Sequence, residues 1–200
     1  MSADEPGLLK RLWTRLWLRR ASFSARYGDL EQLYKVRDPW NLLTPREQAR
    51  FAATNALVAK LAPATLLEIG SGEGAQTHWL QQVAGHVTGI EVSAAAVARA
   101  KQACPGAEFH EGRAEDAARL LAGRHFDLVT AFEVLYYAAD VPVVLAGLQG
   151  LGERLLVTAY RRRAEQLRPH FTGQPGWRQL EDISAEGTEW EVWLWERERG

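Results

Sequence analysis

Short apolar runs alternate with longer amphipathic segments along the chain. A short apolar run bounded by turn residues predicts a buried strand, and apolar residues that recur at helical spacing predict a helix. The expected strands are 66–69, 86–91, 107–110, 126–131 and 154–159. The expected helices are 75–83, 94–103, 116–121 and 141–148. Regular alternation of strands and helices predicts an α/β fold with a mostly parallel sheet.

Two further strand-like runs close the chain. They cover 177–183 and 188–196 and are separated by a short segment that ends in Gly187, so they predict a hairpin. In the second run, bulky apolar residues occupy both faces, because Trp193 and Trp195 stand between the other apolar positions. A strand of this kind is typical of a sheet that is covered on both sides.

The strongest chemical signal is Glu68-x-Gly70-x-Gly72-x-Gly74, which begins within the first expected strand and continues into the turn after it. Glycine lets the backbone approach a ligand closely, and the following helix points its N-terminus at the same place. The spacing is one residue short of the dinucleotide fingerprint, and no P-loop lysine follows Gly74. Glu91 ends the second expected strand, where a carboxylate can accept hydrogen bonds from both hydroxyls of a ribose. The pattern therefore indicates a nucleoside cofactor.

These residues resemble motifs one and two of the class I S-adenosylmethionine (SAM)-dependent methyltransferases. The resemblance runs from about 66 to 159 and implies a Rossmann-like, mostly parallel seven-stranded sheet, with helices on both faces and a C-terminal antiparallel hairpin strand. It also implies SAM as cofactor, S-adenosylhomocysteine (SAH) as product, and no metal. Segment 111–115 is similar to the family's adenine-contacting segment, although Arg113 stands where many members have Asp. Segment 133–137 is similar to the one beside the methyl donor.

Two segments resemble the nodulation protein S family of small N-methyltransferases. They are Arg37-Asp38-Pro39-Trp40-Asn41-Leu42, which is followed by Glu47-Gln48-Ala49-Arg50, and Glu133-Val134-Leu135-Tyr136-Tyr137. The family methylates the free amine of a deacetylated chitooligosaccharide. The resemblance implies that Trp40 packs over the cofactor and that Arg50 pairs with its carboxylate. The alternative interpretation is a buried tryptophan and a solvated arginine.

The motifs and the resemblance together supply the candidate site residues. The expected cofactor-binding residues are Trp40, Arg50, Glu68, Gly70, Ser71, Gly72, Gly74, Glu91, Val92, Arg113, Ala114 and Glu133. The expected catalytic residues are Glu133, Tyr137 and His170. Methyl transfer to an amine requires loss of a proton, which Glu133 or His170 could accept, while a tyrosine could orient the acceptor.

Composition narrows the function classes. A chain of 200 residues fits one α/β domain, and a net charge of −1 gives no basic field for holding nucleic-acid phosphates. Cys104 is the single cysteine, and the five histidines show no metal-ligand spacing, so we expect neither an internal disulfide nor a metal site. No apolar run is long enough to span a membrane, and no signal peptide is evident. We expect a cytoplasmic protein.

The N-terminal segment 7–20 predicts an amphipathic helix. We expect residues 1–36 to form an N-terminal arm and 37–200 to form the methyltransferase domain. The apolar stripe of this helix needs a cover, which could be the fold itself, a second subunit of a homodimer, or a membrane surface at the inner membrane. The alternative to an enzyme is a non-catalytic methyltransferase-like subunit that binds a partner through this helix. The residues of the stripe are Leu9, Trp13, Leu16 and Trp17.

The segment 160–176 is the candidate wall for the acceptor. It leaves the fifth expected strand at its carboxyl end, where open α/β sheets bind ligands. Its arginines suit an anionic acceptor, carrying a carboxylate or a phosphate, better than a polycationic one. A wholly deacetylated glycan would carry many positive charges. The remaining alternatives are a singly deacetylated sugar and another small anionic molecule.

Overall fold

The computed structural model describes residues 27–198. The helices are α2 (Tyr27–Leu33), α3 (Pro45–Leu61), α4 (Thr77–Leu80), α5 (Ala94–Ala103), α6 (Ala117–Leu120), α7 (Val141–Leu151) and α8 (Arg161–Ala164). The strands are β1 (Thr65–Ile69), β2 (His86–Glu91), β3 (Glu108–Glu111), β4 (Leu128–Phe132), β5 (Arg154–Tyr160), β6 (Trp177–Gln179), β7 (Ile183–Ala185) and β8 (Thr188–Glu196). Single 3₁₀ turns are Ala114–Asp116, Leu135–Tyr137 and Arg168–His170. The amphipathic helix expected over 7–20 lies outside the described residues.

Local sequence signals set the ends of the main helices. Helix α3 begins with Pro45, whose missing N–H is not needed in the first turn of a helix. Its C-cap is Ala62, which has a left-handed backbone conformation and donates its N–H to carbonyls of the last turn. Ser93 caps α5 and Asp140 caps α7, each by accepting a hydrogen bond from the N–H three residues on.

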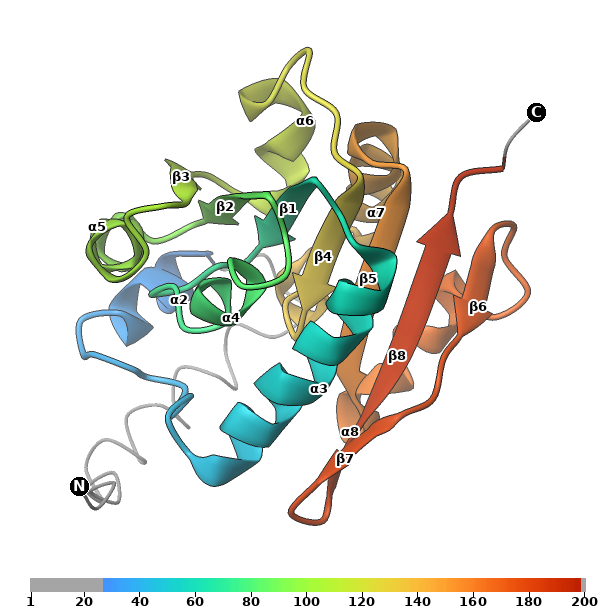
Figure 1. The fold of residues 1–200 in the computed structure, drawn as a ribbon, viewed down its shortest axis with the longest axis horizontal. Coiled ribbons are helices and arrows are strands. Elements are labelled where there is room, and N and C mark those ends of the chain that lie inside the picture. Colours follow the sequence, from blue (N-terminus) through green and yellow to red (C-terminus); the bar gives the residue numbers. More distant parts are fainter. Residues whose placement is uncertain (1–26, 199–200) are drawn as a thin grey trace.

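The strands form one mixed sheet of order β3-β2-β1-β4-β5-β8-β6, with β7 also paired to β8 (Figure 1). Strands β1 to β5 are parallel, and β8 runs antiparallel to β5. The strand order reverses between β1 and β4, and open α/β sheets bind ligands beyond the carboxyl ends of their strands at such a point. The segments that follow Ile69 and Phe132 therefore share the crevice where a ligand is expected.

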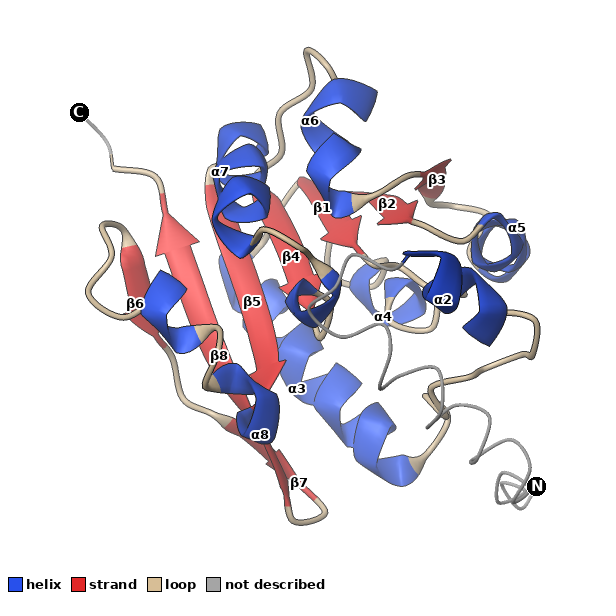
Figure 2. Ribbon diagram, turned by 180° about the vertical axis from the view of Figure 1, so that it is seen from behind, coloured by secondary structure: helices blue, strands red, loops and turns tan. Residues whose placement is uncertain are grey.

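Helices cover both faces of the sheet. Helices α3 and α4 lie on one face, and α6 and α7 lie on the other, which Figure 2 shows from behind. Because side chains alternate along a strand, Leu66 packs in the α3–α4 layer and Leu67 in the α6–α7 layer, both fully buried. Each strand of a two-sided core must be apolar on both faces, which is why the strands read as continuous apolar runs. The expected α/β architecture is confirmed.

Two elements differ from the expected ones. The run 177–183, expected as one strand, is divided into β6 and β7, so the sheet has eight strands instead of seven. The division follows from register: Gln179 pairs with Trp193, whereas Ile183 pairs with Trp190, which leaves one extra residue between the two pairings, as in a β-bulge. The helix expected over 75–83 is α-helical only over α4, because the N–H groups of Gln82 and Val83 donate to carbonyls three residues back instead of four.

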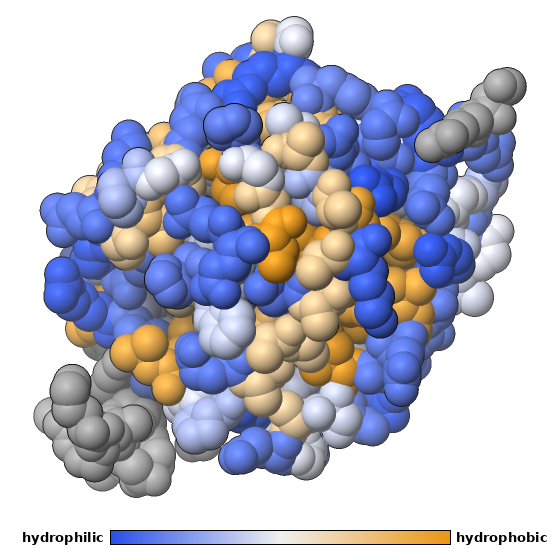
Figure 3. All heavy atoms as spheres, viewed as in Figure 1, coloured by the Kyte–Doolittle hydropathy of each residue, from blue (hydrophilic) through white to orange (hydrophobic). Residues whose placement is uncertain are grey.

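The surface is largely polar. In Figure 3 polar side chains cover the rim of one face, and apolar side chains gather towards its middle. Leu43 and Val143 are the large apolar residues that are well exposed within 27–198. Over the same range, no helix is long and apolar enough to cross a membrane.

Candidate cofactor and acceptor site

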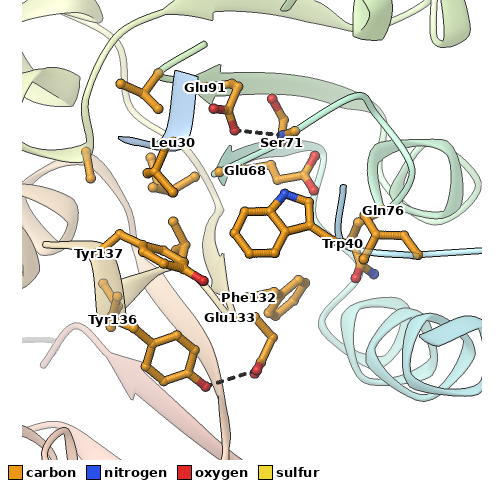
Figure 4. Close-up of a pocket in the computed structure, with 18 of the residues that line it drawn as sticks. Leu30, Trp40, Glu68, Ser71, Gln76, Glu91, Phe132, Glu133, Tyr136 and Tyr137 are labelled. Atoms are coloured by element: carbon orange, nitrogen blue, oxygen red, sulfur yellow. Dashed lines mark hydrogen bonds between the residues drawn. The ribbon is translucent and has the colours of Figure 1, made fainter. Parts of the chain in front are cut away.

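A cavity of about 410 Å³ opens where β1 and β4 end. Its walls come from α2 and the loop behind it, the first turns of α3, the glycine loop after β1, the ends of β2 and β4, and residues of β5, α8 and β8. This volume lies within the range of small-molecule sites, about 300–1,000 Å³. Figure 4 shows side chains from these elements pointing into the same space.

The glycine loop has a backbone that side chains would disturb. Gly70 and Gly72 have φ angles of 75° and 54°, in the left-handed region that favours glycine. A Cβ on Gly70 would lie 2.7 Å from Val134 Cγ2, which real side chains do not tolerate. Gly74, at φ 87°, faces away from the cavity, and its Cβ would lie 3.3 Å from the backbone of Ala100 in α5. The loop is therefore open to a ligand at Gly70–Gly72 and closely packed at Gly74.

Glu91 holds the loop and keeps capacity for a ligand. Its Oε2 accepts a hydrogen bond from the Gly72 N–H at 3.0 Å, and its Oε1 accepts one from the Ser93 N–H at 3.0 Å. Each carboxylate oxygen has a second acceptor position, so two hydroxyl groups can still be bound. Burial raises the pKa of Glu91 to about 7, although the backbone donors oppose this shift.

Glu68 lies at the end of β1 beneath the same loop. Its Oε2 accepts a hydrogen bond from the Thr77 hydroxyl at 2.5 Å, and the residue is 3% exposed. Burial raises the pKa of Glu68 to about 7, and the nearby charge of Glu91 adds to the increase. A cationic ligand in the cavity would lower both pKa values by favouring the ionised carboxylates.

Residues 27–42, which we call the N-terminal cover, close one side of the cavity. Leu30 and Leu33 of α2 are buried and pack near Trp40, whose indole N–H donates to the Tyr34 hydroxyl at 3.0 Å. The Trp40 ring lies in the cavity, with its centroid 5.7 Å from that of Tyr137 (Figure 4). The expected boundary at residue 36 stays a prediction, and residues on both sides of it line the same cavity.

The cover is fastened to α5 and the glycine loop. Arg99 of α5 donates to the Tyr34 carbonyl at 2.7 Å and pairs with Glu73 at 2.6 Å. Glu73 in turn accepts a hydrogen bond from the Asp38 N–H at 2.8 Å. One arginine and one glutamate thus connect the cover to the loop that follows β1.

Arg50 projects from α3 into the opposite wall. Its Nε donates to Glu47 Oε2 at 2.9 Å, its Nη1 donates to Gln76 Oε1 at 3.3 Å, and its residue exposure is only 4%. A fully buried guanidinium with one carboxylate partner has donors to spare for a ligand carboxylate. The position agrees with the role that the resemblance implies, which remains a prediction.

Glu133 follows β4 and is held in an unusual backbone conformation. Its φ of 60° is in the left-handed region, which is uncommon for a residue with a side chain and marks local strain. Its carboxylate accepts hydrogen bonds from the Tyr136 hydroxyl at 3.0 Å, the Thr158 hydroxyl at 3.1 Å and the Tyr160 N–H at 3.2 Å. Burial raises the pKa of Glu133, and the nearby Arg50 charge opposes the shift.

The structure brings all but two of the expected site residues to the cavity wall. Gly74 packs against α5, and His170 lies in the 3₁₀ turn Arg168–His170, outside the lining. Arg113 lines the cavity at its rim, but its guanidinium stacks on the Tyr27 ring at 4.9 Å. The lining residues from the expected set are Trp40, Arg50, Glu68, Gly70, Ser71, Gly72, Glu91, Val92, Arg113, Ala114, Glu133 and Tyr137.

Other lining residues were not among the candidate site residues named from the sequence. They come from elements distant in the chain: Tyr34, Glu47, Gln76, Tyr160, Arg163 and Trp190. Tyr160 and Arg163 belong to the segment 160–176, which the sequence suggested as the acceptor wall without singling out either residue. Glu47 could have been found, because it stands three residues before Arg50 on one helix, which is the spacing of an ion pair. No local pattern marks Tyr34, Gln76 and Trp190, which reach the cavity through tertiary packing.

The charges of the cavity fit a cationic nucleoside. Glu68, Glu91 and Glu133 line it, and within residues 27–198 none of them pairs with a lysine, arginine or histidine. SAM carries a sulfonium and an ammonium against one carboxylate, so its net charge is positive. Three buried carboxylates and one arginine with spare donors complement that distribution. Within the same range, no three histidine, cysteine, aspartate or glutamate side chains are grouped so that they could hold a metal ion.

Residues 67–151 match the family model described as a methyltransferase domain. The fold is similar to that of solved methyltransferases in complex with SAH. The chain is 30% identical over 127 residues to Nodulation protein S of Sinorhizobium fredii. This alignment covers 62% of this chain and 59% of that protein. A match to Nodulation protein S of Bradyrhizobium diazoefficiens is 31% identical over 124 residues and also covers 59% of that relative. The alignments thus span less than two thirds of these curated relatives.

Solved methyltransferase structures have the same fold. The N-methyltransferase NodS from Bradyrhizobium japonicum WM9, in complex with SAH, superposes with a TM-score of 0.69 at 21% identity, over 86% of this chain and 98% of that chain. The plantazolicin methyltransferase BpumL, in complex with a monoazolic desmethylPZN analog and SAH, superposes with a TM-score of 0.71 at 12% identity, over 96% of this chain and 100% of that chain. The chain therefore resembles class I SAM-dependent methyltransferases, and NodS in particular, as its motifs indicate.

Proposed function

We propose that the protein is a SAM-dependent methyltransferase that transfers a methyl group directly to an amine or hydroxyl of a small-molecule or glycan-type acceptor. The observation that carries the proposal is Glu91, a buried carboxylate at the end of β2 that holds the Gly72 N–H and keeps acceptor positions towards the cavity. The likeness to NodS, whose structure contains SAH, supports the same cofactor.

The residues of the cavity divide into two groups. Gly70, Gly72 and Glu91 would hold the nucleoside, while Glu68 and Arg50 would hold the amino acid part of SAM. SAM supplies an activated methyl group, whose carbon bonds to the acceptor as its bond to sulfur breaks. The chain's own task is to orient the acceptor and to exclude water.

Glu133 and Tyr137 lie at the acceptor side of the cavity. Three donors already hold the Glu133 carboxylate, so we assign it to positioning as well as to receiving the proton of an amine. If Glu133 is the base, Glu133→Gln should lower turnover more than tenfold while SAH affinity is retained. If turnover falls less than tenfold, Glu133 is not the base. Tyr137→Phe tests orientation of the acceptor in the same assay.

Calorimetric titration with SAH tests the proposal first. We expect micromolar binding by the wild type and weaker binding by Glu91→Ala, with both proteins shown to be folded by circular dichroism. Mass spectrometry then follows a gain of 14 mass units on a deacetylated chitooligosaccharide, with the N-acetylated form as control. A folded protein that does not bind SAH would refute the enzyme and favour a non-catalytic subunit. That alternative gives no reason for the chain to keep three buried carboxylates around a cavity.

A further inference from the structure

The acceptor end of the cavity contains one arginine that forms no ion pair with any carboxylate of the described residues 27–198. Four arginines line the cavity. Arg46 and Arg50 both pair with Glu47, at 3.0 and 2.9 Å. Arg113 stacks on Tyr27 at the nucleoside end, beside Val92 and Ala114. Arg163 is the fourth, and within residues 27–198 it forms no ion pair with an aspartate or glutamate.

The other arginines near Arg163 in the sequence either form ion pairs or are exposed, and none of them lines the cavity. Arg161 pairs with Asp182 and, at 2.7 Å, with Glu189. Arg168 pairs with Glu191 of β8 through close hydrogen bonds. Arg162 is exposed and does not line the cavity. Among the described residues, Arg163 is therefore the one arginine of the basic segment after β5 that lines the cavity, and it has no ion-pair partner there.

Packing fixes Arg163 against the two tyrosines that follow β4. Helix α8 leaves the end of β5 and packs on β5 and β8, which places Arg163 at the cavity wall in a half-buried position. Its guanidinium lies 5.4 Å from the Tyr136 ring centroid and is close enough to the Tyr137 hydroxyl to lower its pKa. Burial raises the pKa of Tyr137 to about 12, and the charge of Arg163 opposes the rise, so Tyr137 is a neutral phenol at pH 7.

A neutral phenol leaves most of the guanidinium unsatisfied. Arg has five N–H donors in a planar fork that matches the two oxygens of a carboxylate or phosphate, and one tyrosine oxygen occupies a minority of them. Tyr160 and Trp190 line the cavity at the same end, so a flat or apolar body would be accommodated beside the charged group.

We propose that Arg163 is a specificity-determining residue that binds an anionic group of the acceptor, a carboxylate or a phosphate, next to the amine or hydroxyl that is methylated. This inference rests on the proposed function, because it names the class of acceptor for that site. It favours an acidic amine or an acidic phenol over a neutral or polycationic sugar.

Ligand-observed NMR on the SAH complex tests the proposal with matched pairs of probes. Benzoate against benzamide tests for a carboxylate, and phenyl phosphate against phenol tests for a phosphate. We expect at least one anion to bind ten times more tightly than its neutral partner. Arg163→Gln should abolish this preference, Arg163→Lys should retain part of it, and Arg162→Gln, the exposed neighbour, should leave it unchanged.

Two results would overturn the proposal. The first is equal binding of anion and neutral partner by the wild type, and the second is an anion preference that survives in Arg163→Gln. SAH affinity is measured for every variant, and the probes are also titrated without SAH. If the protein did not bind SAH, the proposed function would be refuted. The anion preference is measured independently of that result, because the probes are titrated both with and without SAH.

Discussion

Replacement of Glu91 by glutamine tests the cofactor site most directly. Glutamine has nearly the same shape, but its single carbonyl oxygen cannot serve both the Gly72 N–H and the Ser93 N–H and still accept two hydroxyl hydrogen bonds. A hydrogen bond to a charged group contributes about 1.5–3 kcal/mol. Loss of one such bond to the ribose predicts SAH binding that is weaker by roughly 10- to 150-fold.

Calorimetry at several pH values adds a second measurement to this variant. The pKa of Glu91 in the free protein is about 7, and ribose hydroxyls bind the ionised form. Between pH 8 and pH 6, affinity of the wild type should therefore fall by roughly tenfold from this group, because a proton competes with SAH. The SAH affinity of Glu91→Gln should depend less steeply on pH, and the pH dependence that is left should come from Glu68. The assignment of Glu91 to the ribose would be refuted if the folded variant bound SAH as tightly as the wild type, or if its affinity changed with pH as steeply as that of the wild type.

Three further changes test the fold. Gly70→Ala should destabilise the protein by about 1–3 kcal/mol, because the added Cβ would clash with Val134 and the backbone has a positive φ. The control is Gly147→Ala, which lies in a helix with free space around it and should be neutral or slightly stabilising. Urea denaturation compares the free energies of unfolding of the two variants. Phe171→Ala should cost about 3–5 kcal/mol, because the ring is 1% exposed, and a thermal midpoint near the wild-type value would contradict this packing. In the SAH-free protein, the raised pKa of Glu68 should make the free energy of unfolding fall as pH rises from 4.5 to 7, and Glu68→Gln should reduce that fall; a variant whose pH profile matches the wild type would exclude Glu68 as the source.

The glycine loop and the two strand-end acids were predictable from the sequence because their chemistry is local. Gly70 and Gly72 follow an apolar strand directly, and Glu68 and Glu91 end the two neighbouring strands. Parallel strands end at one edge of a sheet, so the sequence alone predicts that these groups meet. The boundaries of α5 and the ends of β2 were also predicted correctly, since a serine cap and continuous apolar runs define them.

The sequence by itself thus determined the fold class, the positions of the first five strands along the chain and the glycine loop with its acids, because apolar periodicity and turn chemistry act over a few residues. The sequence suggested 160–176 as the acceptor wall, but only the tertiary structure decided which residues line that side of the cavity. Arg163, Tyr160 and Trp190 reach it from α8, β5 and β8, and only the antiparallel insertion of β8 beside β5 brings these elements to the ends of β1 and β4. It also decided which arginine keeps an unbalanced charge, because ion pairs between distant segments depend on packing that no local pattern encodes.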